Sequence, residues 1–104
     1  MKSSLEILNE CVQEYQRTGH WNRSTCDVAA SVGDLNTLKM AHQSGARLSS
    51  FAAEEAALFG HLECLEYVSQ HCDLSKYVYE NALEGKDLNC IKFLETHYPH
   101  FNAL

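Results

Sequence analysis

The sequence has no long apolar run. Its longest uninterrupted apolar stretch covers residues 56–59, far short of the roughly 20 residues that a membrane-spanning helix requires. The N-terminal segment carries Glu6, Glu10 and Glu14 where a secretory leader has an apolar centre. These absences predict a chain that neither crosses a membrane nor is secreted, and that stays inside the cell.

The cysteines lack the pattern of a disulfide framework. Their number is odd, five, and no CxxC motif occurs among them. Small secreted domains usually pair an even number of cysteines, whereas thiols stay reduced in the cytosol. The cysteine pattern therefore predicts a reducing, cytoplasmic compartment.

Basic residues are scarce. Eight lysines and arginines stand against 14 aspartates and glutamates, which gives a formal net charge of −6. Affinity for nucleic acid usually depends on clustered Lys and Arg side chains that displace counterions from phosphates. The charge balance predicts that neither nucleic acid nor an anionic membrane surface is a partner.

What the sequence does contain is an internal repeat. Residues 29–38 align with residues 56–65 at a displacement of 27, and a weaker third copy starts at Asn81. The third copy has Lys86 and Asp87 where the others have one residue, so the displacement there is 25 before the insertion and 26 after it. Such slippage is tolerated at the turns of a repeat array. The spacing predicts three related units.

Each unit is expected to contain two short helices joined by a glycine turn. Glycine reaches the left-handed backbone angles that such a reversal needs, and Gly33, Gly60 and Gly85 stand at the three turns. The expected first helices are 24–32, 50–59 and 75–83, each capped by its opening serine, and the expected second helices are 35–44, 62–71 and 88–97. Their apolar stripes are Leu35, Leu38 and Ala41, then Leu62, Leu65 and Val68, then Leu88, Ile91 and Leu94.

A further helix is predicted before the first unit. Residues 5–16 have helical apolar spacing, and Ser3 with Glu6 forms a capping box that satisfies free amides at the helix start. Helices this short are marginal alone. We therefore predict one all-α domain, a short solenoid of stacked helix-turn-helix units without β-fingers. Its expected parts are a capping helix at 1–18, repeats at 22–48, 49–74 and 75–98, and a C-terminal cap at 99–104.

The repeat resembles the ankyrin family. Residues 56–67 read Ala-Ala, two variable residues, Gly-His-Leu-Glu and a hydrophobic helix, as the second half of an ankyrin repeat does; residues 29–46 match similarly and 81–93 more weakly. The string from Trp21 to Cys26 is similar to short-period ankyrin arrays of giant viruses of amoebae and of some protists. Ankyrin units usually repeat at about 33 residues and carry Thr-Pro-Leu-His, whereas these repeat at 26 or 27 and lack that signature. A viral chain would act in the host cytoplasm.

The resemblance implies a protein-binding scaffold, rather than an enzyme, that binds, recruits or blocks its partner. Ankyrin repeats bind mainly through non-core positions of their first helices. By alignment these positions are Val28, Ser31, Val32, Glu55, Leu58, Phe59, Tyr77, Glu80 and Glu84. The three glutamates would make this face acidic and favour a basic protein partner. Leu58 and Phe59 either anchor a contact or are buried more deeply.

Two other functions remain open. Apolar ends of a stack can self-associate, so the chain is alternatively a structural or assembly subunit of a larger complex or viral particle. Six histidines and five cysteines suggest a metal- or thiol-dependent enzyme. However, Cys64 and Cys90 occupy one repeat position, where Thr37 stands in the first unit, which indicates packing. We therefore predict no catalytic residue, metal or cofactor.

Three aromatic positions have structural interpretations as well. Trp21 is expected to pack at the junction between the capping helix and the first unit. Tyr77 and Tyr79 either close the end of the stack or bind. Pro99 is expected to end the last helix, with Phe101 and Leu104 folding back over it.

Overall fold

The fold is all-α, as predicted. The computed structural model describes residues 1–102, and no strand occurs in that range. Its elements are α1 (Ser4–Thr18), α2 (Thr25–Val32), α3 (Leu35–Gln43), α4 (Ser50–Leu58), α5 (Leu62–His71), α6 (Tyr77–Gly85), α7 (Leu88–His97) and a 3₁₀-helix η1 (Pro99–Asn102). No helix within residues 1–102 has both the length and the apolar character needed to cross a bilayer.

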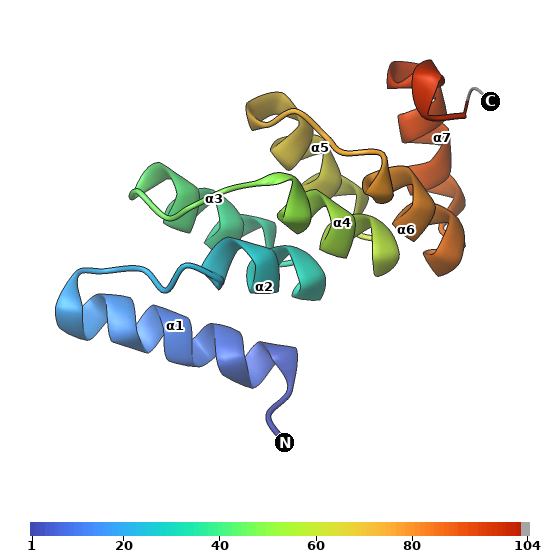
Figure 1. Ribbon diagram of the computed structural model, residues 1–104. Coiled ribbons are helices and arrows are strands. Elements are labelled where there is room, and N and C mark those ends of the chain that lie inside the picture. The colour runs from blue at the N-terminus through green and yellow to red at the C-terminus, as the bar shows by residue number, and fades with distance from the viewer. Residues whose placement is uncertain (103–104) are drawn as a thin grey trace.

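The helices form two rows in an elongated molecule of 48 × 27 × 18 Å (Figure 1). Helix α4 packs between α2 and α6, and each of these three helices contacts the helix that follows it. The second helices α3, α5 and α7 contact one another in turn. Helix α1 packs on α2 at one end, and η1 packs on α7 at the other.

Helix α1 begins with the predicted local signal. The Glu6 amide donates to Ser3 Oγ at 3.2 Å, and the Ser3 amide donates to Glu6 Oε1 at 3.0 Å, which confirms the capping box. Trp21 then stacks on Tyr15 with ring centroids 4.0 Å apart, at the junction between α1 and the first unit as predicted. This stacking holds the connection between α1 and α2 against α1.

Alanines allow the first row, formed by α2, α4 and α6, to pack closely. Four alanines of α4 are fully buried because the helix is covered by α2, α5 and α6 at once: Ala52, Ala53, Ala56 and Ala57. Side chains this small let neighbouring helix axes approach one another. In the second row, formed by α3, α5 and α7, Leu38 and Leu65 at the centres of the first two predicted stripes are fully buried. The last residue of each stripe, Ala41, Val68 or Leu94, is fully buried as well, whereas Ile91 at the centre of the third stripe is half-buried.

The last predicted stripe is only partly correct. Leu88 is 71% exposed, whereas Leu35 and Leu62 at the equivalent positions are half-buried. Helices α3 and α5 are each followed by another second-row helix that contacts them, whereas none follows α7 within residues 1–102.

The prediction for the third glycine turn was wrong. Gly33 and Gly60 have the expected left-handed φ values of 80° and 77°, but Gly85 is the last residue of α6, and the left-handed residue is Lys86, with φ 63°. The insertion in the third unit moves the reversal one residue along the chain. As a result, Gly85 stays helical and Lys86 adopts an angle that favours glycine.

Replacing Lys86 by glycine is therefore expected to stabilise the fold by about 0.5–1 kcal/mol, because the side chain no longer opposes the left-handed angle. Urea unfolding should show a higher midpoint at an unchanged slope. Lys86→Ala is the control, since it removes the same charge but keeps the Cβ atom. An equal gain for both variants would mean that charge, not backbone strain, is responsible.

The predicted serine caps were wrong at two of the three first helices and only partly correct at the other. Ser24 occupies the N-cap position of α2 but makes no side-chain cap bond. Helix α4 is capped by Ser49 instead of Ser50, and α6 starts two residues after Ser75. The hydroxyls of Ser50 and Ser75 are used between units: the Ser75 amide donates to Ser50 Oγ at 2.9 Å, and Ser75 Oγ donates to Glu54 Oε2 at 3.2 Å. These bonds tie the segment before α6 to α4.

The C-terminal segment turns back as predicted for Phe101. Pro99 opens η1 after α7 ends at His97, and Phe101 stacks on Tyr98 with ring centroids 5.2 Å apart while packing against the core. The expectation for Leu104 lies outside the described residues.

Candidate protein-binding surface

The nine predicted binding residues all lie on α2, α4 and α6 or directly after α4, and we call these three helices the first row. Phe59 and Tyr77 are 55% and 54% exposed, and Glu80 and Glu84 are exposed as well. The other five, Val28, Ser31, Val32, Glu55 and Leu58, are half-buried. Of the open alternatives, Phe59 is available for contact, whereas Leu58 is partly covered.

The two tyrosines of α6 differ. Tyr79 is 8% exposed, and its hydroxyl donates to Glu95 Oε2 at 2.7 Å, so it belongs to the packed end of the fold. Tyr77 projects into solvent. Tyr79 is therefore structural, and Tyr77 remains a candidate contact.

The charges of the first row are all of one sign. Its helices carry five carboxylates and no lysine or arginine, and the carboxylates belong to Asp27, Glu54, Glu55, Glu80 and Glu84. The second row and its loops carry residues of both signs, among them Lys39 and Lys92. The first row is thus an acidic surface with exposed aromatic side chains.

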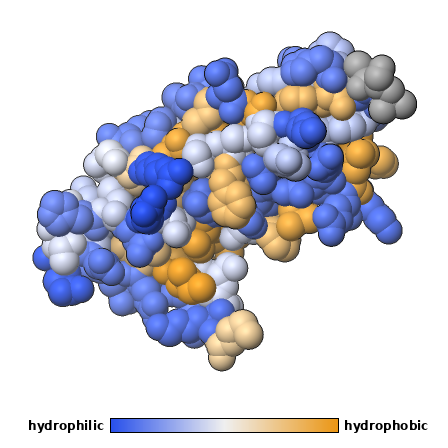
Figure 2. Space-filling view, viewed as in Figure 1, coloured by the Kyte–Doolittle hydropathy of each residue, from blue (hydrophilic) through white to orange (hydrophobic). Residues whose placement is uncertain are grey.

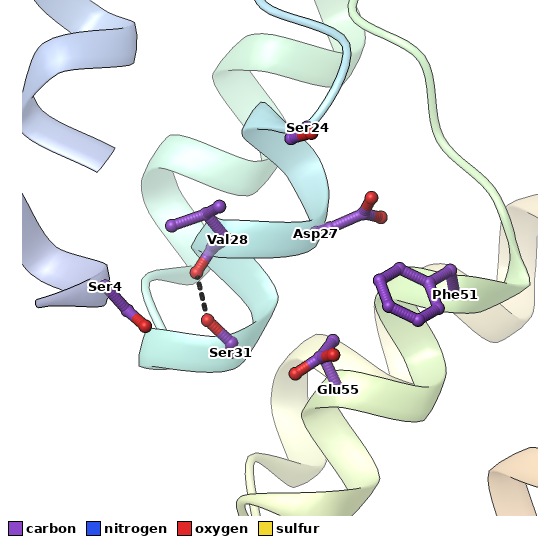
Figure 3. A pocket seen from close by; sticks show the side chains of 7 residues that line it. All are labelled: Ser4, Ser24, Asp27, Val28, Ser31, Phe51 and Glu55. Atoms are coloured by element: carbon purple, nitrogen blue, oxygen red, sulfur yellow. Dashed lines mark hydrogen bonds between the residues drawn. The ribbon is translucent and has the colours of Figure 1, made fainter. Parts of the chain in front are cut away.

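Three of the predicted residues come together in one hollow. It lies between α1, α2 and α4 and has a volume of about 280 Å³ (Figure 3). Its lining residues are Ser4, Ser24, Asp27, Val28, Ser31, Phe51 and Glu55. The remaining six predicted residues lie outside this hollow.

The helical register explains part of this arrangement. On α2, Ser31 follows Asp27 by four residues and Val28 by three, and on α4 Glu55 follows Phe51 by four. Such spacings place side chains next to each other. Ser31 Oγ donates to the Val28 carbonyl at 2.8 Å, so its proton is used within α2. Asp27 and Phe51 were not predicted, although the same spacing identifies them.

The two carboxylates in the hollow are electrostatically unfavourable when ionised. Burial raises the pKa of Asp27, and Glu54 raises it further, while Arg47 acts in the opposite direction. Burial also raises the pKa of Glu55, with Asp27 and Glu54 adding to the effect. Within residues 1–102, neither carboxylate has a hydrogen-bond or ion-pair partner. Each is better accommodated with a proton or a nearby cation.

The double variant Asp27→Asn, Glu55→Gln is therefore expected to melt at a higher temperature than the wild type at pH 7. A raised carboxyl pKa means that the folded state binds more protons, so stability falls as pH rises from the ordinary pKa to the raised one. The advantage of the variant should vanish below about pH 4. Glu84→Gln, which removes a charge from an exposed position, is the control. A higher melting temperature that persists at low pH would contradict this explanation.

The buried cysteines are packing residues. Burial raises the pKa of Cys26 and Cys90 to about 12 and that of Cys64 to about 11. A thiol nucleophile or metal ligand must be deprotonated, which these environments disfavour. Residues 1–102 contain no group of three or more His, Cys, Asp or Glu side chains placed to hold a metal ion.

A histidine–tyrosine cluster joins α3 to α5 in the second row, and the sequence reasoning missed it. His42 Nδ1 lies 2.7 Å from the Tyr67 hydroxyl, and the His42 and His71 ring centroids are 4.8 Å apart. Burial lowers the pKa of His42, and His71 lowers it further. The cluster is a polar contact between neighbouring helix pairs.

Comparison of the chain with family models, with curated proteins and with solved structures found no match. The fold defines the class only as an all-helical protein. The surface adds an acidic row with exposed aromatic side chains and a hollow at its N-terminal end.

Proposed function

We propose that the chain is a short solenoid of ankyrin-like units that binds a basic protein through its first row. Support for the solenoid comes from equivalent positions in equivalent surroundings. Ala30, Ala57 and Ala82 stand at one repeat position and are all fully buried where neighbouring first-row helices meet. Units that bury one another in this way are typical of repeat proteins.

The observation that carries the binding proposal is the composition of the exposed first row. Phe51, Phe59 and Tyr77 are each about half exposed or more, and the helices of the row carry five carboxylates and no lysine or arginine. Lysines flank α6 only at its two ends, where Lys76 Nζ lies 5.7 Å from the Tyr77 ring centroid. Figure 2 shows hydrophobic side chains interspersed with hydrophilic ones over the molecular surface. Exposed aromatic residues are favoured as anchors of protein contacts, and a single-sign field attracts an oppositely charged partner.

The test reverses the charge of the row. Glu55→Lys, Glu80→Lys and Glu84→Lys together should weaken, by at least tenfold, the binding of a partner enriched from the native cell and identified by mass spectrometry. The remaining binding should depend less on salt, because the variant lacks the charge attraction that salt screens. The control reverses three exposed acidic residues outside the row, Glu14, Glu63 and Asp73. Unchanged affinity and salt dependence would show that the face is wrong.

A second variant tests the apolar part of the same surface. Phe59→Asp should abolish capture of that partner. Circular dichroism should still show a helical protein, because the Phe59 side chain is 55% exposed and contributes little to the core. Met40→Asp is the matched control, since Met40 is 43% exposed on α3 in the second row. Equal losses for both variants would argue against a specific site.

One observation favours an assembly role as a second candidate. Leu83 and Leu88 are 46% and 71% exposed at the α7 end of the molecule, where another unit would cover them. If copies associate through this end, sedimentation should show a mass that rises with concentration, and Leu88→Asp should keep the chain monomeric. A monomer at all concentrations would exclude self-association.

A further inference from the structure

The hollow between α1, α2 and α4 is lined by two carboxylates, three serines and two apolar side chains. Figure 3 shows Asp27 on α2 and Glu55 on α4, with Phe51 beside them and Val28 on the α2 wall. Phe51 is 49% exposed. At about 280 Å³, the hollow is smaller than the roughly 300–1,000 Å³ of a small-molecule site. Its size suits one or two side chains of a docked segment.

The charges in the hollow call for a cation. Asp27 and Glu55 repel each other and are half-buried, and burying a carboxylate without a partner is costly. The ion pair formed within residues 1–102 is Lys2 with Glu10 on α1, so Arg47 acts on Asp27 only from beyond ion-pair distance. A cation from another molecule would relieve the repulsion that Arg47 compensates only in part.

An arginine meets these requirements better than a lysine. Its planar guanidinium presents five donors, enough to bind both carboxylates, and it is more weakly hydrated than an ammonium group. The guanidinium also stacks favourably on an aromatic face such as that of Phe51. The half-exposed Phe51 ring leaves further apolar area for a neighbouring side chain.

We propose that this hollow docks a segment of a protein partner in which an arginine stands next to an aliphatic or aromatic residue. The proposal rests on the protein-binding function above and deepens it by naming the chemistry recognised. The arginine binds between Asp27 and Glu55, and the apolar neighbour packs on Phe51.

The experiment selects a display library of random short peptides on the full chain. Enriched sequences should share an arginine beside an aliphatic or aromatic residue. An enriched peptide, labelled and followed by fluorescence anisotropy, should lose at least tenfold in affinity when its arginine is replaced by the neutral isostere citrulline. Asp27→Asn with Glu55→Gln should cause a similar loss. Glu84→Gln, which removes a charge of the same row outside the hollow, should leave affinity within twofold.

Three outcomes would overturn the proposal. One is that the selection enriches no peptide, or only peptides without arginine. Another is that citrulline peptides bind as well, or that the double variant keeps its affinity. The third is that spermidine displaces the peptide as effectively as an arginine peptide does, which would make the hollow a general polycation site. One of these outcomes can occur while charge reversal of Glu55, Glu80 and Glu84 still weakens partner binding. In that case the row binds protein in another way, and only this inference is wrong.

Discussion

Gly85→Ala is expected to destabilise the protein by about 3 kcal/mol or more. A Cβ atom at Gly85 would lie inside the contact distance of the Leu58 carbonyl oxygen, with the Leu58 carbonyl carbon at 2.9 Å and the Ala57 oxygen at 3.2 Å. These are backbone atoms of α4, so α6 would have to move away from the helix it packs against. Forcing atoms into a packed interior typically costs 1–3 kcal/mol, and more when the backbone must shift.

Whether Gly85→Ala lowers or raises stability shows which of two opposing effects is larger. Inside a helix, alanine is favoured over glycine by about 0.5–1 kcal/mol, so propensity alone predicts that Gly85→Ala stabilises α6. The close approach of α6 to α4 opposes that gain, and we expect it to dominate. Urea unfolding monitored by circular dichroism measures the sum.

Gly19→Ala is the control. Gly19 has a left-handed φ of 77°, and a Cβ atom added there would meet nothing within 4 Å among residues 1–102. The substitution should therefore cost only about 1 kcal/mol of backbone strain. If Gly85→Ala instead raises stability, α6 and α4 are further apart than the structure places them.

The repeat spacing predicted most of the helices because it reflects the register of buried positions. The bounds of α5 and α7 agree with prediction at both ends, and those of the other helices agree within two residues. The insertion at Lys86 limits this reasoning. Alignment placed Gly85 at the turn, but Gly85 is helical and packs closely against α4, and the reversal falls at Lys86. Sequence spacing contains no information on that contact.

The surface was less predictable than the fold. Alignment to a repeat identifies positions within each unit, so it found Val28, Ser31 and Glu55. The hollow also depends on α1, which lies outside the repeat and contributes Ser4. Asp27 and Phe51 line it from neighbouring units, and their proximity follows from the packing of α2 on α4. Contacts between units are what single-unit reasoning omits.

Leu65→Ala is expected to destabilise the protein by about 2–5 kcal/mol. Leu65 is fully buried on α5, which packs against α3, α4 and α7. Truncation removes apolar contacts and leaves a cavity that the surrounding helices fill only in part. Leu88→Ala is the matched control, because Leu88 is 71% exposed and such surface changes are usually within about 0.5 kcal/mol.

The same variant tests whether the helices unfold together. Trp21 stacks on Tyr15 at the α1 end of the molecule, so its fluorescence reports unfolding of that end, while circular dichroism reports all helices. Helices of eight to ten residues are marginal alone, so loss of the central packing should release the α1 end at the same urea concentration. Coincident transitions in Leu65→Ala are therefore expected. Fluorescence that changes at a higher urea concentration than the dichroism would show that α1 and α2 persist without the centre.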